Sequence, residues 1–122
     1  LDYIARICGD TPFVDPVAIR ACVAKAEMEE WDLVTDVPYP RRDYVSVEAV
    51  PILTLERLHR VARLPIEREH VTQYAYRRSP LFRIADIGAD PARTHVTGAT
   101  IIDIEADLAR AEQLLAEGKI TW

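Results

Sequence analysis

Residues 6–16 read RICGDTPFVDP, and this stretch decides how the chain begins to fold. It continues an apolar run from Tyr3 to Cys8 that has the length and composition of a buried strand. The dipeptide Gly9-Asp10 is typical of a turn, and Asp15-Pro16 is typical of a helix N-cap followed by proline at the first helical position. The stretch therefore predicts a strand that leads through a short loop directly into a helix.

The same alternation of strands and helices continues along the chain. A strand (3–8), a helix (17–29) and a strand (31–35) in close order indicate a right-handed crossover between parallel neighbours. The apolar face of the helix is predicted to consist of Val17, Ala21, Ala24 and Met28. Further strands are expected at 45–52, 82–87 and 99–102, and further helices at 54–64 with Thr54 as its cap, at 66–78 and at 104–117 with Gly118 as its C-cap. The predicted fold class is α/β.

Composition restricts the class of protein. The 122 residues are enough for one domain with a real core, and we expect a single domain over 1–122. With a net charge of −5 and scattered basic residues, no nucleic-acid partner is expected, because binding to phosphates needs clustered positive charge. No apolar run is long enough to span a bilayer, so no membrane partner is expected either. Two cysteines make no disulfide framework, which favours the reducing cytoplasm.

The start of the sequence resembles the middle of a longer polypeptide. It runs directly into a strand at Tyr3, and no methionine precedes Met28. We therefore expect the chain to be part of a longer protein.

Two aspartates, Asp10 and Asp103, each follow an apolar strand and precede a helix. Ligands of open parallel sheets bind at the carboxyl ends of strands, and two carboxylates meeting there would suit Mg²⁺. The alternative is that Asp103, Glu105 and Asp107 only stabilise the N-terminus of the helix that follows. Local pattern leaves both interpretations open.

A second cluster, Glu67-Arg68-Glu69-His70, lies in the predicted helix 66–78. In a continuous helix His70, Tyr74 and Arg77 would share one face, which could bind a phosphate or a carboxylate. A solvated or interface helix explains the same pattern. His59 and His95 have no partner nearby in the sequence, and we assign them no role.

Four stretches, taken in order, resemble a known family. They resemble the C-terminal half of the cytidylyltransferases, which include spore-coat polysaccharide biosynthesis proteins and relatives of the acylneuraminate and 3-deoxy-manno-octulosonate cytidylyltransferases. The resemblance implies part of a Rossmann-like nucleotide-sugar transferase fold, with a mostly parallel sheet, flanking helices and the N-terminal nucleotide-binding half absent. The stretches are RICGDTPFVDP, VSVEAVPILTLERL, IEREHVTQYAYRRSPLFRI and IIDIEADLARAEQLL.

This resemblance implies an activity and a set of site residues. Members of the family couple CTP to a hydroxyl of an acidic sugar and release pyrophosphate. By resemblance, Asp10 and Asp103 would hold Mg²⁺ against the phosphates, and Glu105 would be a further acid of the catalytic site. Glu48 would lie near the sugar, and the segment Arg68, Glu69 and His70 would shape the sugar pocket or a contact between the subunits of a homodimer.

Two alternatives remain open at this point. Gln73, Ala99 and Ile101 depart from the family pattern, which would suit a degenerate, non-catalytic oligomerisation or binding module of the same fold. A metal-dependent glycosyltransferase of the related nucleotide-sugar fold would also use paired acids.

Overall fold

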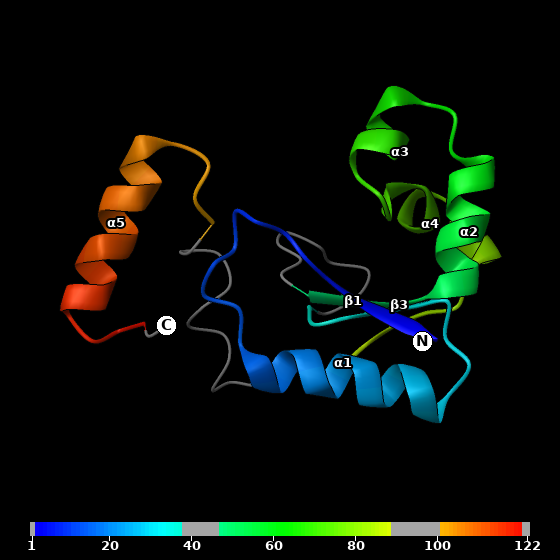
Figure 1. Cartoon of the computed structure of the whole chain (residues 1–122), viewed down its shortest axis with the longest axis horizontal. Coiled ribbons are helices and arrows are strands. Elements are labelled where there is room, and N and C mark those ends of the chain that lie inside the picture. Colours follow the sequence, from blue (N-terminus) through cyan, green and yellow to red (C-terminus); the bar gives the residue numbers. More distant parts are fainter. Residues whose placement is uncertain (1, 38–46, 89–100, 121–122) are drawn as a thin grey trace.

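The computed structural model describes residues 2–37, 47–88 and 101–120 and places a small sheet between helices (Figure 1). The strands are β1 (Tyr3–Ile7), β2 (Leu33–Thr35), β3 (Val47–Pro51) and β4 (Ile84–Asp86). The helices are α1 (Pro16–Met28), α2 (Ile52–Val61), α3 (Pro65–Glu69), α4 (Gln73–Arg77) and α5 (Glu105–Ala116), and η1 (Ser79–Leu81) is one 3₁₀ turn. The predicted α/β class is confirmed.

The four-stranded sheet has the order β1-β3-β2-β4. β3 pairs antiparallel with both β1 and β2, and β2 pairs parallel with β4, so the sheet is mixed and the predicted mostly parallel sheet is wrong. The first two strands, β1 and β2, do run parallel to each other, since each pairs antiparallel with β3. Their predicted direct pairing is wrong, because β3 lies between them. Residues 47–50 of β3 are buried, as expected of a strand with neighbours on both sides and helices on both faces.

Helix α1 covers one face of the sheet (Figure 1). It begins as predicted, since the Asp15 carboxylate accepts a hydrogen bond from the Val17 N–H at 2.8 Å and Pro16 is the first helical residue. The predicted apolar face is wrong, because Val17 and Met28 are exposed. The residues that pack against Val34, Val47 and Ala49 are Ala18, Cys22 and Ala26. Small side chains let the helix approach the sheet closely.

Helices α2 and α4 pack on the opposite face. Val50 and Leu33 pack with Tyr76 of α4, and Leu58 of α2 packs with Ala75 and Phe82. Pro51 is the last residue of β3, and α2 starts immediately after it, so Thr54 lies within the first turn and is not the predicted cap.

The segment predicted as one helix over 66–78 is two short helices, α3 and α4. The chain turns between them at 70–72, where Thr72 is buried and its hydroxyl bonds to the Glu48 carboxylate. The predicted shared face of His70, Tyr74 and Arg77 is therefore wrong, since it required a continuous helix. Tyr74 instead packs edge-to-face on Phe82, with ring centroids 6.1 Å apart.

Helix α5 lies at the far end of the molecule from α2 and α3 (Figure 1). A separate small core joins it to the loop after β1, through Phe13, Ala111 and Ile120. The helix ends at Ala116 with Glu117 as its C-cap, so the predicted C-cap Gly118 is one residue too late. Gly118 follows the cap with a positive φ of 66°, a conformation that favours glycine. Ile101 and Ile102, within the strand predicted at 99–102, are not in a strand; residues 99 and 100 lie outside the described ranges.

Two further features concern the cysteines and the length of the helices. Cys8 and Cys22 are both free thiols. None of the helices in residues 2–37, 47–88 and 101–120 combines the length and the apolar composition needed to cross a bilayer.

Candidate functional site

Asp10 and Asp103 lie close together in the fold, although 93 positions separate them in the sequence. The backbone N–H of Ile102, the residue before Asp103, donates a hydrogen bond to the backbone carbonyl of Asp10 at 2.8 Å. This bond joins the turn after β1 to the segment that leads into α5. Both aspartates are exposed, so their carboxylates can meet a ligand from solvent.

Of the three acids that could stabilise the start of α5, Asp107 is the one that caps it. The Asp107 carboxylate accepts hydrogen bonds from the backbone N–H groups of Asp103 and Ile104, both at 3.2 Å. Within the described residues, the carboxylates of Asp10, Asp103 and Glu105 make no hydrogen bond or ion pair. The sequence left capping and metal binding open for these acids, and the structure assigns the cap to Asp107 and leaves the Asp10 and Asp103 carboxylates available.

The carboxylates of Asp10 and Asp103 suit Mg²⁺ better than they suit a metal whose ligands all come from the protein. Mg²⁺ prefers oxygen ligands and is commonly bound by one or two carboxylates together with substrate phosphates and water. In the described part of the chain, no three side chains of His, Cys, Asp or Glu gather to form a closed cage. A pair of exposed carboxylates therefore suits a cation that arrives with a phosphate ligand.

Glu48, the third predicted site residue, lies in the middle of the sheet and is only 1% exposed. Its carboxylate accepts hydrogen bonds from the Tyr76 hydroxyl at 2.6 Å and from the Thr72 hydroxyl at 2.9 and 3.0 Å to its two oxygens. It also forms an ion pair with Arg6 at 2.7 Å. A buried carboxylate is stable only when it is paired and hydrogen-bonded, and these partners meet that requirement.

The ion pair with Glu48 also affects the pKa of Arg6. Burial of the guanidinium opposes its charged form, but the charge and hydrogen bond of Glu48, with a smaller contribution from Cys8, outweigh burial and raise the pKa of Arg6. Arg6 therefore stays charged at any physiological pH. Its side chain is 26% exposed, so part of the guanidinium faces solvent.

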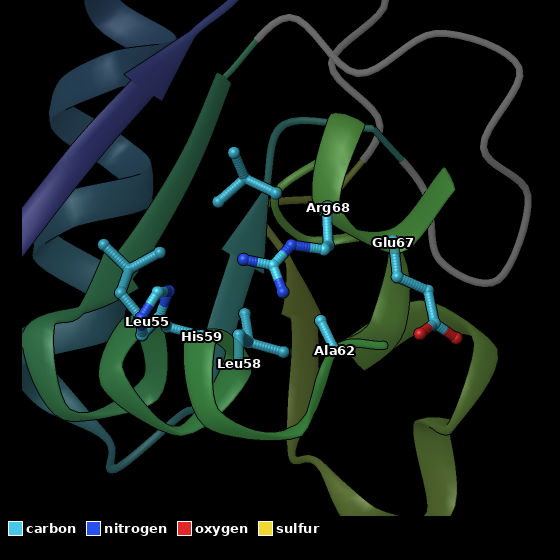
Figure 2. A pocket seen from close by; sticks show the side chains of 7 residues that line it. Leu55, Leu58, His59, Ala62, Glu67 and Arg68 are labelled. Atoms are coloured by element: carbon cyan, nitrogen blue, oxygen red, sulfur yellow. The ribbon is translucent and has the colours of Figure 1, made fainter. Parts of the chain in front are cut away.

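Arg68, Glu69 and His70 lie elsewhere, around α3. Arg68 lines a pocket of about 180 Å³ between α2 and α3, and its guanidinium reaches across the pocket towards Leu58 and His59 (Figure 2). Glu69 and His70 are exposed and do not line the pocket. Sequence analysis assigned no role to His59, which also lines it, while His95 lies outside the described residues.

The predicted site residues thus form separate groups. Asp10, Asp103 and Glu105 lie around the start of α5, and Arg68, Glu69 and His70 lie around α3, at the opposite end of the view in Figure 1. Glu48 lies in the sheet and joins β3 to β1 and α4. Sequence reasoning missed three of its partners, Arg6, Thr72 and Tyr76. Arg6 was visible as the first residue of RICGDTP, but its ion pair joins positions 42 residues apart.

Glu67 lines the same pocket wall as Arg68, but its carboxylate points away from Arg68 (Figure 2). It accepts hydrogen bonds at 3.1 Å from the backbone N–H groups of Arg63 and Leu64. The bond from Leu64 lowers the pKa of Glu67, and although burial acts in the opposite direction, the Arg63 N–H and the charges of two arginines add to the lowering. The net pKa lies below the ordinary 4.5.

This lowered pKa predicts a pH-dependent effect of Glu67→Gln. A carboxylate with a folded pKa below its unfolded value stabilises the fold above the unfolded pKa, and this contribution is lost as the pH falls through the folded pKa. We therefore expect Glu67→Gln to melt at a lower temperature than the wild type at pH 7. The difference should shrink as the pH falls below about 4.5. Thermal melts over a pH series would check it, and a difference that grows on acidification would contradict it.

Comparison with known proteins adds one finding. No family model matches the chain, and no curated protein is similar to it. Among solved structures, a cytidylyltransferase from Leptospira borgpetersenii serovar Hardjo-bovis (strain JB197) superposes with a TM-score of 0.69 at 21% sequence identity, over 97% of this chain. The chain has the fold of part of a cytidylyltransferase. It spans 58% of the length of that cytidylyltransferase. At this identity the likeness shows the fold, and the activity is a separate question.

Proposed function

We propose that this chain is the metal and sugar part of a cytidylyltransferase, which transfers a cytidylyl group from CTP to a hydroxyl of an acidic sugar and releases pyrophosphate. The observation that carries the proposal is the backbone hydrogen bond between Ile102 and Asp10, which brings the chain at Asp103 beside Asp10 within a fold like that of a solved cytidylyltransferase. The motif resemblance in the sequence supports the same activity.

In this proposal Asp10 and Asp103 hold Mg²⁺. The ion would supply charge neutralisation to the triphosphate and its pyrophosphate leaving group, which is the main requirement of such transfers. Glu105, the first residue of α5, would be a further acid of the catalytic site, outside the metal's own ligands. Asp107 would keep the Asp103 backbone in place through its hydrogen bond.

The residues around α3 lie at the other end of the molecule from the carboxylate pair (Figure 1). The resemblance implies a sugar pocket or a subunit contact for Arg68, Glu69 and His70. We propose the subunit contact, because a sugar that reacts beside Asp10 and Asp103 would lie far from α3. The exposed side chains of Leu64, Ile66 and Val71 surround the same helix and would suit contact with a second copy in a homodimer.

The test uses the protein that carries this chain. Pyrophosphate release is measured with CTP, Mg²⁺ and a panel of sugar acids, with neutral hexoses as the matched controls. We expect release with CTP and at least one sugar acid, no release with the hexoses, and loss of release when EDTA removes the metal.

An absence of release with every acid, together with a stable dimer by light scattering and no response to CTP or Mg²⁺, would contradict the proposal and favour the non-catalytic module. Release of free nucleotide from ready-made nucleotide sugars would favour the glycosyltransferase.

A further inference from the structure

Glu48 is poorly placed to touch a substrate itself. Its side chain is 1% exposed, and both carboxylate oxygens already accept hydrogen bonds from Arg6, Thr72 or Tyr76. A ligand could reach it only by displacing one of these partners, which would leave a buried charge without compensation. The carboxylate is therefore suited to holding its neighbours in place.

Arg6 is the partner that faces outward. It lies directly opposite Glu48 in the β1–β3 register, so the two side chains share the face of the sheet on which α4 packs. β1 is an edge strand, and the Arg6 side chain is 26% exposed. The ion pair uses Nη1, and a guanidinium has five N–H donors in a planar fork, so it can bind a second anion while it stays paired.

Arg6 also lies close to the carboxylate pair. Asp10 follows it by four positions, a span of at most about 14 Å even in a fully extended chain. A substrate whose hydroxyl reacts beside Asp10 and Asp103 could therefore place an acidic group against Arg6. Arg68 lies on α3, at the other end of the molecule from α5 (Figure 1).

We propose that Arg6 binds the acidic group of the acceptor sugar, and that Glu48, Thr72 and Tyr76 are positioning residues that hold its guanidinium at the sheet edge. This inference rests on the proposed function and deepens it, because it names the contact that would select an acidic sugar over a neutral one. The donor fork of arginine matches the two oxygens of a carboxylate.

The experiment measures binding without turnover. The probes are 3-deoxy-manno-octulosonate and its methyl ester, which keeps the sugar body and removes the charge, titrated by calorimetry into the protein that carries this chain. We expect the acid to bind about tenfold to a hundredfold more tightly than the ester, as is typical of a charged hydrogen bond. In Arg6→Gln this preference should disappear, and Arg6→Lys should restore part of it.

The controls separate positioning from stability. Arg20→Gln removes an exposed arginine from α1, on the opposite face of the sheet, and should leave the preference unchanged. Tyr76→Phe removes one donor to Glu48, and it should weaken binding of the acid while the affinity for the ester stays the same. If Tyr76 had only a structural role, Tyr76→Phe would melt at a lower temperature but keep the wild-type ratio of acid affinity to ester affinity.

The inference is overturned if the acid and the ester bind the wild type equally, if neither binds, or if a folded Arg6→Gln protein keeps the preference. These outcomes are independent of the pyrophosphate assay. A preference that depends on Arg6 in a protein without transferase activity would leave the anion site standing and remove the proposed function. Normal transferase activity with equal binding of the acid and the ester would leave the proposed function standing and remove the anion site.

Discussion

Replacing Asp10 and Asp103 together by asparagine is expected to lower Mg²⁺-dependent pyrophosphate release by about a thousandfold or more. Asparagine keeps the shape of each side chain but removes the negative charge that would attract the cation of the proposed site. Metal catalysis of this kind supplies several kcal/mol of transition-state stabilisation, and each ~1.4 kcal/mol corresponds to a factor of ten in rate. Steady-state assays over a range of Mg²⁺ concentrations would measure the loss.

The fold should survive this double substitution. Both side chains are exposed and make no hydrogen bond or ion pair within the described residues, so the free energy of unfolding should change by less than about 0.5 kcal/mol. Glu112→Gln, at an exposed position on α5, is the matched control and should keep the wild-type rate. A double variant that releases pyrophosphate at the normal rate would refute the metal assignment.

Replacing Glu48 by alanine is expected to lower the free energy of unfolding by about 3 kcal/mol. The substitution removes the shared acceptor of Arg6, Thr72 and Tyr76, and it opens a space between β3 and α4. The Thr72 hydroxyl is buried, and the loss of its bond to Glu48 removes a reason for the chain to turn between α3 and α4. Urea denaturation followed by circular dichroism would measure the change.

Glu48→Gln is the matched variant for this prediction. The amide oxygen can still accept from the two hydroxyls, so the loss should be smaller, about 1 kcal/mol, and should come mainly from the ion pair with Arg6. Arg6 is partly exposed, and water therefore replaces some of the lost interaction. Equal stability of Glu48→Ala and the wild type would show that this network contributes nothing to the fold.

Several elements were predictable because their signals are local. Asp15-Pro16 starts α1, Pro51 ends β3, and Gly118 adopts its positive φ directly after the C-cap of α5, each where its backbone preference requires it. The proximity of Asp10 and Asp103 was also expected from the sequence, since both follow apolar segments and precede helices. Their approach nevertheless depends on a backbone hydrogen bond outside any strand, because Ile102 is not part of the sheet.

The apolar face of α1 was ambiguous in the sequence. The helix is rich in alanine, so two faces have similar apolarity, and periodicity alone selected the one that contains Val17 and Met28. Packing chose the face with Ala18, Cys22 and Ala26, whose small side chains fit against Val34 and Ala49. The division of 66–78 into α3 and α4 has a similar origin, because the buried Glu48 carboxylate binds Thr72 in the middle of an otherwise helical pattern.

The sequence by itself determined the α/β class, the limits of α1 and α5 and the positions of the acidic residues, because these follow from preferences of neighbouring residues. Only the tertiary structure decided the strand order, the burial of Glu48 and the outward position of Arg6. These features depend on which distant segments share a buried face, and a buried carboxylate must find its donors wherever the chain brings them. Local periodicity in the sequence does not indicate which distant residues will pair.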